Sequence, residues 1–108
     1  MCGIAGFSQF NQVKAKQQTL VEMGNAIFHR GPDAGGEYLD DDIALCHRRL
    51  SIIDLTDAGI QPMHSSDDKF VIAFNGEIYN FSALRSSLQA EGYIFKTHTD
   101  TEVILALY

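Results

Sequence analysis

The sequence predicts an α+β domain, because stretches with the apolar pattern of strands alternate with stretches that have the apolar pattern of helices. Two observations carry this prediction. The apolar runs Cys2–Phe7 and Lys69–Phe74 are short and β-rich, as is typical of buried strands. Apolar residues recur at helical spacing in 17–29 and 81–91, and each stretch is followed within two residues by glycine, which often ends a helix.

The first half of the chain predicts strands around one helix. The helix spans Gln17–His29, with Leu20, Met23 and Ile27 on one face, and Gly31-Pro32 ends it. The other predicted elements are the strand 2–7, a loop over 30–36, paired strands at 36–39 and 43–48 around the acidic turn 40–42, a short strand at 50–54 and an irregular stretch through Ser66.

The second half predicts a central strand followed by two helices. Lys69–Phe74 is that strand, and Asn75-Gly76 predicts a tight turn after it. Asn80 is the predicted N-cap of a helix through Glu91. The remaining predicted elements are a strand at 93–97 and a last helix opened by the capping box of Thr99 and Glu102.

The last predicted helix ends on an apolar run, 103–108, that has no C-cap. A natural domain rarely ends on such an exposed apolar run. The sequence therefore predicts that residues 1–108 are the front part of a larger domain.

Composition argues against several classes of function. The chain has 108 residues and a net charge of −6, without the basic stripe that nucleic-acid binding requires. It contains no apolar run that could span a membrane, and positions 1–10 do not form a signal peptide. Cys2 and Cys46 are too few for a disulfide framework, which favours a cytoplasmic protein, and the histidines lack metal-ligand spacing.

The most informative residue is Cys2. Removal of Met1 would leave this cysteine with the free α-amine of the chain. An ordinary thiol titrates near ~8.5 and an α-amine near ~7.7–8.0, so both are partly reactive at neutral pH. One residue would then supply a nucleophile and a base, and no histidine would be required. The ordinary alternative is a cysteine at position two behind a retained Met1.

Three further positions offer complementary groups, each with an ordinary alternative. Asn75-Gly76 could form an oxyanion hole, or only a hairpin turn. Arg49 could clamp a substrate carboxylate through two hydrogen bonds, or be a surface arginine. Asp100, assisted by Glu77, could receive a substrate ammonium, or only complement a helix dipole.

Taken in order, several segments of the chain resemble one family. These segments are Cys2-Gly3-Ile4-Ala5-Gly6, His29-Arg30-Gly31-Pro32-Asp33 with Gly36, Arg49-Leu50-Ser51-Ile52-Ile53-Asp54, Gln61-Pro62, Phe74-Asn75-Gly76-Glu77-Ile78-Tyr79-Asn80 and Asp100-x-Glu102-Val103-Ile104. They are similar to the N-terminal glutaminase domain of glutamine-hydrolysing asparagine synthetases. That domain is a class II glutamine amidotransferase and an N-terminal nucleophile hydrolase, and the resemblance covers essentially the whole chain.

The resemblance implies a role for each matching residue. The implied catalytic residues are Cys2 as nucleophile, with its amine as general base, and Asn75 and Gly76 as the oxyanion hole. The implied glutamine-binding residues are Arg49, Leu50, Ser51, Ile52, Ile53, Asn75, Gly76, Glu77 and Asp100. Arg49 would hold the α-carboxylate and Asp100 the α-ammonium, while a thioester on Cys2 would be hydrolysed to glutamate and ammonia.

The resemblance also implies an αββα sandwich, of which 1–108 would be the first half: a type 2 glutamine amidotransferase domain that is truncated at its C-terminal end. The implied partners are L-glutamine and a synthetase domain that is absent from this chain. ATP and Mg²⁺ are expected only for that domain, and this chain itself is expected to need no cofactor. The ammonia acceptor and the oligomeric state stay open, and a homo-oligomer is compatible with the sequence. The alternative function is a non-catalytic glutamine-binding or interface fragment of such an enzyme.

Overall fold

The computed structural model describes residues 2–8, 16–50 and 59–108. The elements in those ranges are β1 (Gly3–Ser8), α1 (Lys16–Ala26), the 3₁₀ turn η2 (Phe28–Arg30), β2 (Ala34–Leu39), β3 (Ile43–Arg49), β4 (Met63–His64), β5 (Val71–Ile72), α2 (Phe81–Ala90) and α3 (Asp100–Leu107). This combination of small sheets and helices confirms the predicted α+β class.

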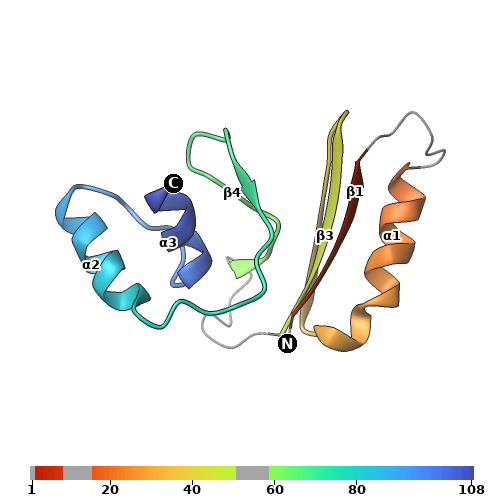
Figure 1. The fold of residues 1–108 in the computed structure, drawn as a ribbon, viewed down its shortest axis with the longest axis horizontal. Coiled ribbons are helices and arrows are strands. Elements are labelled where there is room, and N and C mark those ends of the chain that lie inside the picture. Colours follow the sequence, from red (N-terminus) through yellow and green to blue (C-terminus); the bar gives the residue numbers. More distant parts are fainter. Residues whose placement is uncertain (1, 9–15, 51–58) are drawn as a thin grey trace.

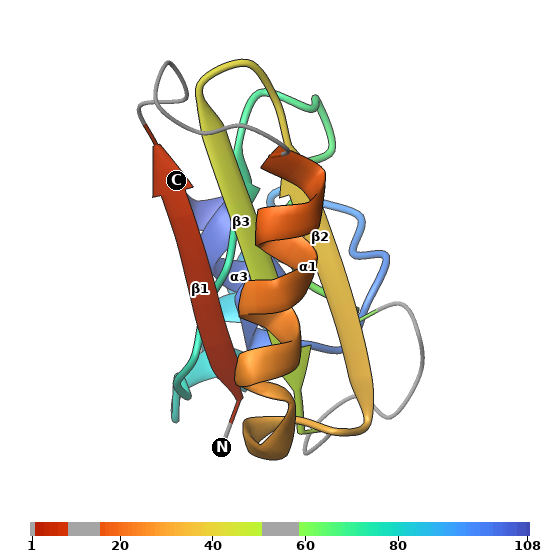
Figure 2. The same cartoon turned by 90° about the vertical axis from the view of Figure 1, so that its right-hand side faces the viewer.

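The larger sheet, sheet A, has the antiparallel strand order β1-β3-β2. The helix α1 lies across one face of this sheet (Figure 2). Its Leu20, which is fully buried, packs with Ala44 and Cys46 of β3, and partly buried Phe7 and Met23 extend this core. Burial of these apolar side chains between helix and sheet stabilises this half of the molecule.

Alternation along β3 divides its side chains between two environments. Ala44, Cys46 and Arg48 face α1, where the Arg48 Nε–H donates to the Gly24 carbonyl at 3.1 Å. The residues between them face the other way, and the buried His47 reaches the Phe74 carbonyl on the far side of the sheet. One strand therefore supplies a structural core on one face and polar groups on the other.

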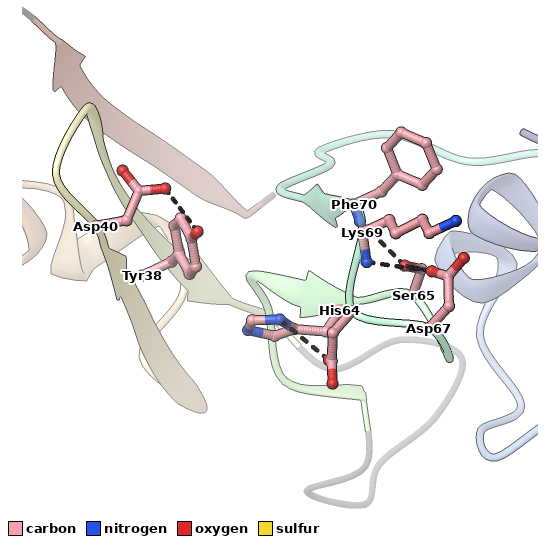
Figure 3. Close-up of polar contacts among 8 residues, drawn as sticks. Tyr38, Asp40, His64, Ser65, Asp67, Lys69 and Phe70 are labelled. Carbon is pink, nitrogen blue, oxygen red and sulfur yellow. Dashed lines mark hydrogen bonds and ion pairs between the residues drawn. The ribbon is translucent and has the colours of Figure 1, made fainter.

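A second, two-stranded sheet, sheet B, pairs β4 with β5 in antiparallel register. The turn between these strands is built by side chains: Ser65 Oγ donates to Asp67 Oδ1 at 2.7 Å, and the Lys69 backbone N–H donates to the same oxygen at 3.1 Å (Figure 3). The bond from Ser65 lowers the pKa of Asp67. Sheet B lies between sheet A and the helices α2 and α3 (Figure 1).

Acidic side chains also build the hairpin between β2 and β3. The Asp40 carboxylate accepts a hydrogen bond from Tyr38 Oη at 2.7 Å (Figure 3). It also accepts hydrogen bonds from the Asp42 and Ile43 backbone N–H groups, each at 2.7 Å. These bonds, the one from Tyr38 first, lower the pKa of Asp40. The acidic turn predicted from the sequence is therefore confirmed, and its charge has a structural role.

The strands predicted at 2–7, 36–39 and 43–48 are confirmed with small shifts of their ends. The first predicted helix ends at Ala26 and continues as η2, which ends just before Gly31. The second is confirmed as α2, although Asn80 makes no side-chain capping bond, and Gly92 follows it with a φ of 101°. Of the strand predicted at 50–54, all but Leu50 lies outside the described residues.

The prediction of a central strand over Lys69–Phe74 is wrong. Only Val71–Ile72 form a strand, β5, which pairs with β4 in a two-stranded sheet. Strand pairing stops before Phe74 because its N–H donates to the Gln61 side chain and its carbonyl meets His47, so neither group pairs with a strand. The stretch predicted to be irregular through Ser66 contains β4, and Asn75-Gly76 is not a hairpin turn because no strand follows it.

The strand predicted at Tyr93–Thr97 is also wrong. The Lys96 and Thr97 N–H groups donate to the Glu102 carboxylate, at 2.9 and 3.3 Å, and therefore do not pair with a strand. Half of the predicted capping box is confirmed, since Thr99 Oγ1 accepts from the Glu102 N–H at 3.2 Å, whereas the Thr99 N–H donates to Thr97 Oγ1. Glu102 thus serves the preceding loop as well as the start of α3.

Candidate active site

A pocket opens between the end of sheet A, the first turn of α3 and the segment that follows β5. Its lining residues are Cys2, His47, Arg49, Leu50, Gly59, Gln61, Phe74, Gly76, Glu77, Thr99, Asp100 and Thr101. Six residues singled out in the sequence are therefore brought together, although they come from both ends of the chain.

Cys2 lies at the entrance to β1, beside the end of β3. Gly3 pairs with Arg48, so the antiparallel register places Cys2 level with Arg49. The Leu50 backbone N–H donates to Cys2 Sγ at 3.4 Å, and Sγ lies 3.8 Å from the Leu50 carbonyl oxygen. The Cys2 carbonyl accepts from Arg30 Nε at 3.1 Å. The Leu50 backbone thus holds the thiol at the pocket, and Arg30 holds the Cys2 backbone.

Arg49 is the last residue of β3, and only 7% of its surface is exposed. Its guanidinium packs against the backbone of Gly59: a Cβ placed at Gly59 would lie 2.6 Å from Arg49 Nη2. Glycine is therefore required at this position for the guanidinium to lie where it does. The arrangement places a buried cationic group in the pocket wall.

Asp100 is the first residue of α3, and only 5% of its surface is exposed. Its Oδ2 accepts a hydrogen bond from the Ile78 backbone N–H at 2.9 Å. Glu77, which precedes Ile78, is exposed and also lines the pocket. The pocket therefore combines one guanidinium with two carboxylates, a pattern that complements a zwitterionic ligand.

The two residues of the predicted oxyanion hole differ in position. Gly76 lines the pocket, and the Phe74 ring lies so close that a Cβ at Gly76 would be 2.9 Å from the ring's ζ carbon. Asn75 is exposed, and the pocket lining does not include it. Ser51, Ile52 and Ile53, which the resemblance assigns to glutamine binding, lie outside the described residues.

The sequence reasoning missed six residues of the pocket: His47, Gly59, Gln61, Phe74, Thr99 and Thr101. His47 could have been found, because it lies two residues before Arg49 on a strand and therefore shares its face. Burial lowers the pKa of His47, and the charge of Arg49 lowers it further, whereas the bond to Phe74 opposes this shift. His47 is therefore neutral at physiological pH. Gln61 belongs to the Gln61-Pro62 segment of the resemblance, but neither that segment nor its spacing gave Gln61 a role in the site.

Of the two cysteines, Cys2 lines the pocket and Cys46 does not. Both cysteines are free thiols, but Cys46 lies on the opposite face of sheet A, where burial raises its pKa. Within 2–8, 16–50 and 59–108, no group of three or more His, Cys, Asp or Glu side chains could hold a metal ion. In the same ranges no helix is both long and apolar enough to cross a membrane.

Comparisons with known proteins show which sequences this chain resembles. The family model described as "Glutamine amidotransferase domain" matches residues 1–108. The chain is 44% identical over 113 residues to asparagine synthetase [glutamine-hydrolyzing] 1 of Bacillus subtilis (strain 168) and 44% identical over 110 residues to asparagine synthetase B [glutamine-hydrolyzing] of Escherichia coli (strain K12). All of this chain is covered in both cases, but only 17% and 19% of the two relatives, so the chain spans less than a fifth of their length.

Proposed function

This chain belongs to the glutamine amidotransferase domain family, and from that premise we propose that its pocket hydrolyses glutamine to glutamate and ammonia through Cys2. Family membership confirms the resemblance drawn from the sequence motifs. The observation that carries the proposal is the pocket itself, in which the Cys2 thiol lies with Arg49, Asp100 and Glu77. Glutamine presents one carboxylate, one ammonium and one amide, and this set of groups complements all three.

In the proposed reaction, Arg49 binds the α-carboxylate of glutamine, and Asp100 with Glu77 binds the α-ammonium. The α-amine of Cys2 takes the thiol proton, and the thiolate attacks the side-chain amide carbon. The carbon–nitrogen bond then breaks as the protonated amine returns this proton to the leaving nitrogen, which departs as ammonia. Water then attacks the thioester, which releases glutamate and restores the thiol. This scheme requires removal of Met1, because only then is the amine of Cys2 free.

The negative oxygen that forms during attack needs hydrogen-bond donors. We assign this role to the Gly76 N–H and the Asn75 side chain. Gly76 lines the pocket, whereas the exposed Asn75 would have to turn its amide inward when glutamine binds. The assignment of Asn75 therefore depends on the family resemblance more than on its position.

The order of layers supports a place for this chain in an αββα sandwich. In Figure 1, α1, sheet A, sheet B and the pair α2 and α3 lie in this order from the right side of the view to the left. We propose that these elements are part of the sandwich of N-terminal nucleophile hydrolases, and that the remainder of a type 2 glutamine amidotransferase domain completes it.

The names of the relatives suggest where the ammonia goes. Both are asparagine synthetases, so we propose a cytoplasmic protein that supplies ammonia to an ATP-dependent synthetase domain. The described residues of this chain offer no donor cluster for a magnesium ion, and we assign no ATP or magnesium step to it.

A paired cysteine substitution tests the proposal. Glutamate release from glutamine is measured for the protein at its full natural length, for Cys2→Ala and for Cys46→Ala. Cys2→Ala should abolish release, while Cys46→Ala should retain it, because Cys46 packs on the opposite face of sheet A. Retained turnover in Cys2→Ala would overturn the assignment of the nucleophile. Glutamine binding without turnover in the unsubstituted protein would favour the alternative of a binding module.

A further inference from the structure

The segment that joins β5 to α2 forms neither strand nor helix, yet it is held at two points. The Phe74 N–H donates to Gln61 Oε1 at 2.6 Å, and the Phe74 carbonyl lies 3.3 Å from His47 Nε2. Further along, the Ile78 N–H donates to Asp100 Oδ2 at 2.9 Å. Asn75, Gly76 and Glu77 lie between these fixed points. The position of the proposed oxyanion hole is therefore set by side chains from other elements.

His47 holds the first of these points from β3. A carbonyl oxygen can only accept a hydrogen bond, so His47 Nε2 carries the proton and donates to Phe74. The Phe74 carbonyl and the Asn75 N–H belong to one planar peptide unit. The bond from His47 therefore fixes the direction in which the Asn75 N–H points. His47 is 1% exposed, which limits its freedom to leave this position.

Gln61 holds the N–H group of the same residue. Gln61 is buried, and its two amide atoms have complementary partners: Oε1 accepts from Phe74, and Nε2 donates to Thr101 Oγ1 at 3.1 Å. A flipped amide would set its NH₂ group against the Phe74 N–H, so the arrangement has one favourable orientation. Because Thr101 follows Asp100, Gln61 also ties this segment to the start of α3.

We propose that His47 and Gln61 are positioning residues of the glutaminase site, and that they orient Asn75 and Gly76 through the Phe74 backbone. We name these two hydrogen bonds the Phe74 clamp. The inference rests on the proposed function, and it assigns neither residue a contact with glutamine. The clamp should therefore act on the chemical step, in which the oxyanion forms, more than on the binding of glutamine by Arg49 and Asp100.

A first experiment separates these two effects kinetically. His47→Leu removes the donor to Phe74, whereas His47→Gln keeps an amide donor, and His29→Leu makes the matched change at an exposed histidine outside the pocket. For His47→Leu we expect kcat for glutamate release to fall about 10- to 100-fold, as small misplacements of catalytic groups do. The KM for glutamine should stay near that of the unsubstituted protein. His47→Gln should recover part of kcat, and His29→Leu should change neither constant.

A second experiment does not depend on activity. Amide hydrogen exchange of the peptide over 70–80 is compared between the unsubstituted protein, His47→Leu and Gln61→Met, since Gln61→Met removes the acceptor of the Phe74 N–H. Faster exchange confined to this peptide supports the clamp. Unchanged exchange in both variants overturns it, as does an unchanged kcat or a parallel change of kcat and KM in His47→Leu. If the unsubstituted protein hydrolyses no glutamine, the proposed function fails, whereas the exchange result still decides whether the clamp exists.

Discussion

The described residues before position 51 and those from 59 onward are built in different ways. In the first, strands of six and seven residues pair in a continuous ladder, and α1 covers one face of the sheet. In the second, the strands β4 and β5 have two residues each, and polar side chains bind the backbone N–H groups of Phe74, Ile78 and Lys96. The pocket lies where the two parts meet, so its geometry depends on both kinds of construction.

This difference has a consequence for substitutions. A ladder shares its stability among many backbone bonds, so the loss of one surface side chain changes it little. In the second part, the carboxylates of Asp100 and Glu102 and the amide of Gln61 each satisfy backbone groups that have no strand partner there. Single polar substitutions should therefore lower the free energy of unfolding more in residues 59–108 than in residues 2–50.

The largest effect on activity should come from substitution of Asn75, in the second part. Asn75→Ala should lower kcat for glutamine hydrolysis by about 10²- to 10³-fold, as does loss of a donor to a developing oxyanion. The KM should change much less, because Asn75 is not assigned to the charged groups of glutamine. Steady-state kinetics on Asn75→Ala and on the exposed neighbour variant Asn80→Ala measure this. Equal activity of both variants would remove Asn75 from the oxyanion hole.

A smaller effect on activity should distinguish substitutions on the two faces of β3. Arg49→Lys should raise the KM for glutamine by about 10-fold or more, because an ammonium cannot reproduce the paired hydrogen bonds of a guanidinium to a carboxylate. Arg48→Lys is the matched control, since Arg48 bonds Gly24 and Asn25 on the opposite face. An unchanged KM in Arg49→Lys would give Arg49 a purely structural role.

Two glutamate substitutions test whether side-chain bonds to the backbone stabilise the second part more than the first. Glu102→Gln should destabilise the fold by about 1–2 kcal/mol, because the buried carboxylate binds the Lys96 and Thr97 N–H groups through charge-assisted bonds. Glu37→Gln, at an exposed position of β2, should have little effect, since its partner Gln17 lies at the surface. Urea unfolding of both variants gives the two free energies. Equal losses of stability would contradict the difference proposed between the two parts.

The smallest effect concerns pH. Burial lowers the pKa of His47 in the folded state, so below about pH 6.5 the unfolded state binds more protons at this residue than the folded state does. The His47 contribution to stability is therefore complete above that pH and falls as the pH falls towards the folded pKa. His47→Leu should flatten the decrease in unfolding free energy that occurs as the pH falls below about 6.5. An identical slope in both proteins would place His47 in a solvated environment.

Prediction from the sequence succeeds in the first part, where local patterns determine the strands, and fails more often in the second, where side chains from other segments bind the backbone. The strand 43–48 and its acidic hairpin were predictable, because alternation and turn residues act locally. The prediction of a strand at 93–97 failed because the Glu102 side chain, several residues away, takes the backbone N–H groups that a strand would use. Local propensity contains no information about such a bond.

The candidate site shows the same limits. Cys2, Arg49 and Asp100 were chosen from motifs, and the structure brings them into one pocket. His47 shares a strand face with Arg49 and was within reach of the same reasoning. Gln61 was not, because its partners Phe74 and Thr101 are far from it in the sequence and meet it only in the folded chain.

The central claim is that Cys2 is a processed N-terminal nucleophile in a glutamine site. The most direct measurement is an intact mass spectrum of the protein after incubation with a diazoketone analogue of glutamine, followed by peptide mapping. We expect a mass without Met1 and with one covalent adduct, located on Cys2. A mass that retains Met1 and carries no adduct, or an adduct on Cys46 instead, would contradict it.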